Sequence, residues 1–136
     1  MQIQPYLFFE GRCEEALMFY RDVLGAEITQ LMRYSDNPDP PPGMLPPGSE
    51  NCIMHASMRI GDSTVLASDG NCSGTTGFNG FSLTLNATTD AEAERLFAAL
   101  AEGGQIRMPM APTFFSSRFG MLADRYGLGW MVLVPA

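Results

Sequence analysis

The sequence predicts an α+β protein built from two copies of a β-α-β-β-β module. Two segments of helical period each lie between strand-like runs, and each half then ends in two strands joined by a tight glycine turn. Few residues are identical between the halves, so the order of the elements carries the inference of an internal duplication. We expect one domain, with module one at about 1–70, a linker at about 70–78 and module two at about 79–136.

The first module begins with the strand-like run "IQPYLFF", and a helix is predicted over residues 12–24. The helix has an apolar stripe at helical spacing, made of Ala16, Leu17, Phe19, Tyr20, Val23 and Leu24. Gly25 is a natural C-terminal stop, and the strand-like run "AEITQLMR" follows it.

The second module repeats this order, with "FSLTLNA" before a helix predicted over residues 90–102 and "QIRMPM" after it. Thr89 and Glu92 have the spacing of a capping box at the start of that helix, and Gly103 ends it. Each half closes on a predicted hairpin, "CIMHASMRIGDSTVLASD" in the first and "RFGMLADRYGLGWMVLVP" in the second. The two turns match at Gly61 and Gly127.

A proline-rich segment at 35–51, "SDNPDPPPGMLPPGSEN", separates the second and third strands of module one. Its six prolines and two glycines exclude regular helix or sheet pairing over much of its length. A loop of this length is often a lid or a dimer arm. A solvated insertion explains the composition equally well.

Composition excludes several classes of partner. The chain has 136 residues, a formal net charge of −7 and no lysine, so neither nucleic acid nor an anionic membrane is an expected partner. No apolar run approaches the roughly 18 residues of a membrane helix. The start "MQIQPYLFFEG" lacks the features of a signal peptide, and we therefore expect a cytoplasmic protein.

The three cysteines, Cys13, Cys52 and Cys72, show no CxxC spacing. Their odd number and their spacing disfavour both a disulfide framework and a zinc knuckle. We expect reduced and mostly buried thiols.

The doubled pattern resembles the vicinal oxygen chelate superfamily, which includes glyoxalases, extradiol dioxygenases and bleomycin-resistance proteins, and within it the PhnB-like branch. The resemblance rests on "EALMFYRDVLGAE", "IMHASMRIGDSTVLASD" and "FGMLADRYGLGWMV", and it spans the chain from about residue 3 to 135. It implies that the two modules form a cupped, mixed β-sheet barrel with the helices outside. The cavity between the modules would hold the substrate.

Metal-dependent members of this superfamily place His, Glu or Gln on the first and last strands of each half. The matching positions here are Pro5 on the first strand, Phe81 or Leu83 on its counterpart, Met131 on the last strand, and Val65, Leu66 or Ala67 at the end of module one. None of these side chains suits a divalent ion that prefers nitrogen or anionic oxygen, so no metal is expected.

PhnB-like sequences have also carried a ubiquinone-biosynthesis methyltransferase label. A nucleotide-type cofactor favours a glycine-rich turn between a strand and a helix. The glycine-rich "GNCSGTTGFNG" at 70–80 precedes a strand instead, so we interpret it as the linker and expect no cofactor.

His55 is the single histidine of the chain, and strand alternation places it on a polar face. Alternation separates two sets: Cys52, Met54, Ala56 and Met58, and Ile53, His55, Ser57 and Arg59. The second set should face the cavity, with Arg59 near the rim. His55 is either a structural histidine or a general acid/base oriented by Asp69.

The segment "FFSSRFGML" at 114–122 is a second candidate. Phe115 and Arg118 would suit an amphipathic ligand with an anionic group. Alternatively, the aromatics belong to the core and Arg118 is solvated. The predicted ligand-binding residues are His55, Ser57, Phe81, Leu83, Phe115, Arg118 and Met131.

These observations predict metal-free binding of a small, partly apolar molecule in the cup. The alternative is a metal-independent isomerase, lyase or hydrolase in which His55 is the general acid/base. A third possibility is a cup filled by its own side chains in a protein that acts through dimerisation. A homodimer is expected in each case.

Overall fold

A computed structural model describes residues 1–37 and 48–136. The predicted lid or dimer arm therefore lies mostly outside the described residues. The chain divides into two compact units, Met1–Thr76 and Gly77–Ala136, which we call module one and module two.

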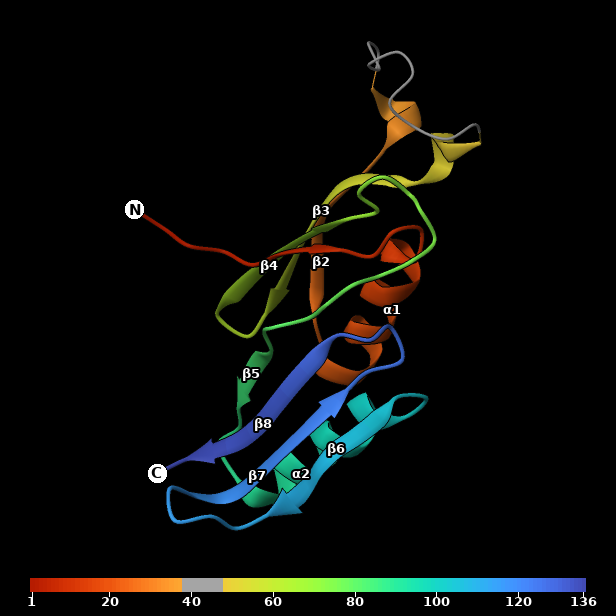
Figure 1. Cartoon of the computed structure of the whole chain (residues 1–136). Coiled ribbons are helices and arrows are strands. Elements are labelled where there is room, and N and C mark those ends of the chain that lie inside the picture. The colour runs from red at the N-terminus through yellow and green to blue at the C-terminus, as the bar shows by residue number, and fades with distance from the viewer. Residues whose placement is uncertain (38–47) are drawn as a thin grey trace. The chain divides into compact units, whose positions relative to one another are not determined.

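Module one is a four-stranded mixed sheet with one helix (Figure 1). Its elements are β1 (Tyr6–Phe8), α1 (Cys13–Leu24), β2 (Glu27–Arg33), two short 3-10 helices (Tyr34–Asp36 and Ser49–Asn51), β3 (Ile53–Ile60) and β4 (Ser63–Ser68). The strand order is β1-β4-β3-β2. β1 runs parallel to β4, and the other pairs are antiparallel.

Module two repeats this topology. Its elements are β5 (Leu83–Asn86), α2 (Asp90–Ala101), β6 (Gln105–Ala111), β7 (Ser116–Ala123) and β8 (Gly129–Pro135). The strand order is β5-β8-β7-β6, with β5 parallel to β8. The predicted α+β class and the repeated βαβββ order are therefore confirmed. The described strands form two four-stranded sheets and no closed barrel.

Both predicted helices form within one residue of the expected bounds. α1 ends at Gly25, whose φ of 68° is the left-handed conformation that glycine adopts without steric cost. α2 begins at Thr89, whose hydroxyl accepts a 3.1 Å hydrogen bond from the amide of Glu92. The Glu92 carboxylate accepts from the amide of Thr88 rather than from Thr89 itself. No helix among the described residues is long and apolar enough to cross a membrane.

Each helix buries its apolar stripe against its own sheet. In module one, Ala16, Leu17 and Tyr20 of α1 are fully buried. In module two, Gly120 of β7 leaves space for the ring of Phe97 of α2, which an added Cβ would meet at 2.7 Å. One face of each sheet is therefore covered by a helix of its own module.

Candidate functional site

The uncovered face of the module-one sheet collects side chains from four strands. Tyr6 of β1 lies beside Leu66 of β4, and Leu66 lies beside Ser57 of β3. Ser57 in turn lies beside Gln30 of β2. Residues paired across a ladder share a face of the sheet. Tyr6, Leu66, Ser57 and Gln30, together with the residues two positions along each strand, therefore form one surface, which we call the open face. The row between them is Leu7, Ala67, Ala56 and Leu31, and its first three members are buried.

Tyr6 and His55 meet at the centre of the open face. The Tyr6 hydroxyl lies 3.0 Å from Nδ1 of His55, and the two ring centroids are 5.7 Å apart. The ring of Phe8 lies 5.0 Å from that of Tyr6 and is half exposed. His55 is partly buried, and its position opposite Met32 fixes it on this face. The arrangement offers apolar ring surface beside a hydrogen-bonding pair.

Strand alternation holds for His55 and Ser57, which share one face of the sheet, but it fails at Ile53. Ile53 is 1% exposed, although alternation groups it with His55. Met32 and Arg33 of β2 pair with His55 and Ile53, so the ladder passes over Met54 of β3, and an irregularity of this kind interrupts alternation. Arg59 is exposed on the open face and pairs with Glu27.

Asp69 is not the partner of His55. The residue is 3% exposed, and its carboxylate accepts hydrogen bonds from three backbone amides, those of Gly11 at 2.9 Å, Cys13 at 2.8 Å and Ile53 at 2.7 Å. The prediction of an Asp69–His55 pair is therefore wrong. Asp69 instead supplies the capping oxygen at the start of α1, where the side chain of Arg12 makes no capping hydrogen bond.

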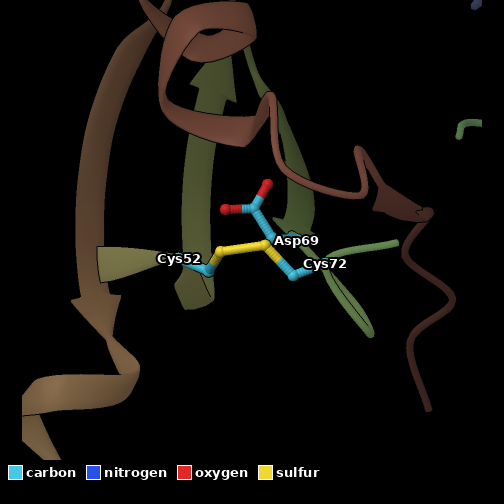
Figure 2. Close-up of side chains that lie close together, drawn as sticks. All are labelled: Cys52, Asp69 and Cys72. Atoms are coloured by element: carbon cyan, nitrogen blue, oxygen red, sulfur yellow. A yellow bond between two sulfur atoms is a disulfide. The ribbon is translucent and has the colours of Figure 1, made fainter. Parts of the chain in front are cut away.

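The cysteine prediction was wrong for two of the three residues. Cys52 and Cys72 form a disulfide with Cα atoms 6.6 Å apart (Figure 2). Their sequence separation of 20 residues carries no local signature of pairing. Cys13 is a buried free thiol, as expected. Burial, and after it the charges of Asp69 and Glu14, raise the pKa of the Cys13 thiol far above its ordinary value.

The candidate residues of module two lie in different environments. Met131 lies between Thr84 and Met121 on the uncovered face of its sheet. Leu83 lies opposite the buried Trp130, and so it shares the face that α2 covers. Phe81 precedes β5, is 45% exposed and meets Phe78 edge to face at 6.2 Å.

Arg118 forms ion pairs with two acidic residues of α2. Its Nε donates to Glu94 at 2.9 Å, and its Nη1 lies 3.7 Å from Asp90. The hydrogen bond to Glu94, followed by the charge of Asp90, raises the pKa of Arg118. The ring of Phe115 lies edge to face against Phe119 at 5.3 Å. The alternative in which the aromatics belong to the core and Arg118 is solvated is not what the structure shows, because Phe114 and Phe115 are exposed and Arg118 is paired.

Comparison with known proteins places the chain in a family. The family described as 3-demethylubiquinone-9 3-methyltransferase matches residues 1–133. The chain belongs to this family. Escherichia coli protein YjdN is 34% identical over 98% of this chain and 95% of its own length.

Two solved structures agree with the family assignment. Protein PA1353 from Pseudomonas aeruginosa is 41% identical, with a TM-score of 0.87 over 99% of this chain and 98% of its own. A PhnB protein from Bacillus cereus, titled a putative 3-demethylubiquinone-9 3-methyltransferase, is 31% identical, with a TM-score of 0.81 over 98% and 99%. The resemblance to the PhnB-like branch of the vicinal oxygen chelate superfamily is thereby confirmed.

The positions where this superfamily holds a metal do not fit one here. These positions are Pro5, Phe81 or Leu83, Met131, and Val65, Leu66 or Ala67. In module one Leu66 pairs with Tyr6, and in module two Met131 pairs with Thr84. None of these side chains in either module is an imidazole, a carboxylate or a thiolate, and Met131 offers only a thioether. A divalent ion would find too few strong donors at these positions.

The family description also implies a methyl donor of nucleotide type, which the strand-to-helix turns do not fit. At the start of α1, the amides of Gly11 and Cys13 already donate to Asp69. At the start of α2, the amide of Glu92 already donates to Thr89. A phosphate or ribose cradle needs such amides to be available, so neither turn provides one.

Proposed function

We propose that the open face of module one binds a small, partly apolar molecule that carries a hydrogen-bonding group. The hydrogen bond between Tyr6 and His55 is the observation that carries the proposal. It orients two polar rings beside Phe8 and leaves Nε2 of His55 available to a ligand. Tyr6 is 37% and Phe8 51% exposed, and aromatic surface of this kind gains free energy when a ligand covers it.

The pairing of the arginines favours a ligand without a strong negative charge. Arg59, which shares the open face, pairs with Glu27. Arg118, which the sequence made a candidate for contacting an anionic group, pairs with Glu94 and Asp90. An anionic ligand would have to displace a carboxylate from either side chain, which opposes its binding. We therefore infer a neutral ligand recognised by ring stacking and by hydrogen bonds to His55 and Ser57.

The proposal rests on module one alone. The uncovered face of module two, with Met131, Met121 and Thr84, is a further apolar surface that could contact a ligand. Leu83 and Arg118 do not belong to the proposed site. The cup between the modules, the homodimer and the cytoplasmic location stay predictions.

A ligand screen tests the proposal. Compounds that bind the purified protein are found by ligand-observed NMR, and native mass spectrometry detects any molecule retained through purification. Phe8→Ala and His55→Gln should each weaken binding by about tenfold or more, the effect expected from losing one buried ring contact or hydrogen bond. Phe114→Ala is the matched control, because Phe114 is fully exposed outside this face. Equal affinity in all three variants would place the ligand elsewhere.

Metal-independent acid–base catalysis by His55 is the second candidate. It is favoured by the contact at Nδ1, because a side chain that holds one imidazole nitrogen orients the other toward a substrate. Once a substrate is known, His55→Gln should abolish turnover while the variant still binds and folds. Tyr6→Phe should lower turnover less, since it removes only the orienting hydroxyl. Full turnover in a folded His55→Gln variant would reject His55 as the general acid or base.

A further inference from the structure

Cys52, Asp69 and Cys72 form a cluster with the spacing of metal ligands. Cys52 directly precedes β3, whereas Asp69 directly follows β4 and Cys72 lies three residues later. One ligand atom from each lies within 4.8 Å of the other two. Figure 2 shows the Asp69 carboxylate beside the two sulfur atoms. The cluster contains neither Tyr6 nor His55, so it is separate from the proposed binding site.

Hydrogen bonds hold all three residues in place independently of the disulfide. The amide of Cys72 donates to the carbonyl of Asp69 at 2.7 Å, and the amide of Cys52 donates to the carbonyl of Ser49 at 3.0 Å. The Asp69 side chain is fixed by its three amide donors. Reduction of the sulfur–sulfur bond therefore leaves the donor atoms near one another.

The loop that carries Cys72 has its own attachments. The amide of Ser73 donates to the Glu10 carboxylate at 3.1 Å, and the amide of Gly74 donates to the Glu10 carbonyl at 2.7 Å. On the other side, the Tyr34 hydroxyl donates to the carbonyl of Gly70 at 2.8 Å. The loop is thus tied on both sides to segments of the same module, at Glu10 after β1 and at Tyr34 after β2, which keeps Cys72 facing Cys52 after reduction.

The dimensions of the cluster suit a tetrahedral ion. Zinc–sulfur bonds of about 2.3 Å place two thiolates of one site roughly 3.8 Å apart. Side-chain rotation alone can reach that separation from a Cα–Cα distance of 6.6 Å. Asp69 accepts three hydrogen bonds, and a carboxylate has about four lone-pair positions, so one remains for an ion.

A cavity gives an ion access to the cluster. It has a volume of about 290 Å³, and both Cys52 and Asp69 line it. Glu14 and Glu15 also line it, with Arg33 as the cationic residue, so carboxylates outnumber the positive charge there. Arg33 is itself paired with Glu14 at 2.6 Å. The cavity can admit a cation and the water that would complete four-coordination.

We propose that Cys52, Cys72 and Asp69 bind one zinc ion when the disulfide is reduced. A cellular dithiol supplies two electrons and two protons, so the Cys52–Cys72 bond becomes two thiols and the dithiol becomes its own disulfide. Zinc then displaces both thiol protons and binds two thiolates and the Asp69 carboxylate. Sulfur ligands favour zinc over magnesium or calcium. Oxidation reforms the disulfide and releases the ion, which makes the site sensitive to redox conditions.

Zinc titration of the two redox forms tests this proposal. Protein reduced with a dithiol and desalted without oxygen should bind one zinc per chain in competition with a chromophoric chelator. The oxidised protein should bind none. Cys52→Ser and Cys72→Ser should each weaken zinc binding at least about 100-fold. Even the loss of a residue that only hydrogen-bonds a metal ligand lowers metal affinity about 10- to 100-fold. Cys13→Ser is the matched control, because it removes a cysteine outside the cluster.

A measurement on the unmodified chain guards against variants that fail to fold. Cadmium added to the reduced protein should produce the ultraviolet charge-transfer absorption of a metal thiolate, and oxidation should remove it. Zinc binding that is equal in the two redox forms, or retained by folded Cys52→Ser protein, would overturn the proposal. A reduced protein that shows neither zinc binding nor the cadmium absorption would also overturn it.

Discussion

The carboxylate of Asp69 accepts a 2.7 Å hydrogen bond from the amide of Ile53 and thereby joins the end of β4 to the start of β3. Its second oxygen accepts hydrogen bonds from the amides of Gly11 and Cys13 at the start of α1. Asp124 has a similar role in module two, where it accepts the amides of Tyr126 and Leu128 and, at 2.9 Å, the indole N–H of Trp130. Each module therefore depends on one buried carboxylate next to a sheet strand.

Removal of the Asp69 carboxylate should destabilise module one. Asp69→Ala leaves three amides without their acceptor, and we expect a loss of about 3 kcal/mol or more in the free energy of unfolding, measured by urea denaturation. Asp36→Ala is the control, because the exposed Asp36 accepts one amide, that of Arg33. It should cost less than about 1 kcal/mol. Equal losses in the two variants would contradict the role of Asp69.

Asp124 and Trp130 should be energetically coupled. Trp130→Phe removes the indole N–H that donates to Asp124. Asp124→Asn weakens the hydrogen bonds that Asp124 accepts from Trp130 and from the amides of Tyr126 and Leu128. A double-mutant cycle followed by circular dichroism should give a coupling free energy of about 1–3 kcal/mol. Additive losses would show that the indole hydrogen bond contributes nothing beyond packing.

Gly104 should not tolerate a side chain. A Cβ at this position would lie 2.2 Å from the carbonyl oxygen of Ala123, and backbone atoms cannot move aside as a flexible side chain can. Gly104→Ala should therefore cost about 1–3 kcal/mol, measured by thermal unfolding. The control is Gly77→Ala, since a Cβ at Gly77 would meet nothing within 4 Å. A stable Gly104→Ala variant would contradict the close approach of these segments.

The Cys13 thiol should make stability fall at alkaline pH. Its pKa in the folded chain lies above the ordinary value of 9.0, so above that pH the unfolded chain loses a proton that the folded chain keeps. Proton loss then favours unfolding, and the free energy of unfolding falls as pH rises beyond 9.0. Cys13→Ala should show a smaller fall between neutral and alkaline pH. Identical pH profiles, measured by urea denaturation, would contradict this origin.

Elements with local signals were predictable, whereas contacts between distant segments were not. The helix after Thr89 was predicted because its cap and its apolar stripe lie within one short segment. The placement of His55 and Ser57 followed from alternation along one strand. Asp69 was assigned to the wrong partner, since its true donors lie 58, 56 and 16 residues away.

The candidate site shows the same division. Tyr6 was not predicted as the partner of His55, because the family resemblance assigns the ligand position of the first strand to Pro5. Strand alternation from Leu7, an apolar residue, would have placed Tyr6 on the opposite face. The Cys52–Cys72 pair left no such signal, since neither its spacing nor its neighbours indicate a disulfide.

By itself, the sequence determined the two modules, their helices and the open face of β3, because periodicity and caps act over a few residues. The tertiary structure alone decided which polar groups meet. It brought Tyr6 to His55 across 49 residues and Asp69 to three amides, and it joined Cys52 to Cys72. The physical reason is that hydrogen bonds and disulfides depend on atomic separations of a few ångströms, which strand pairing and sheet topology set.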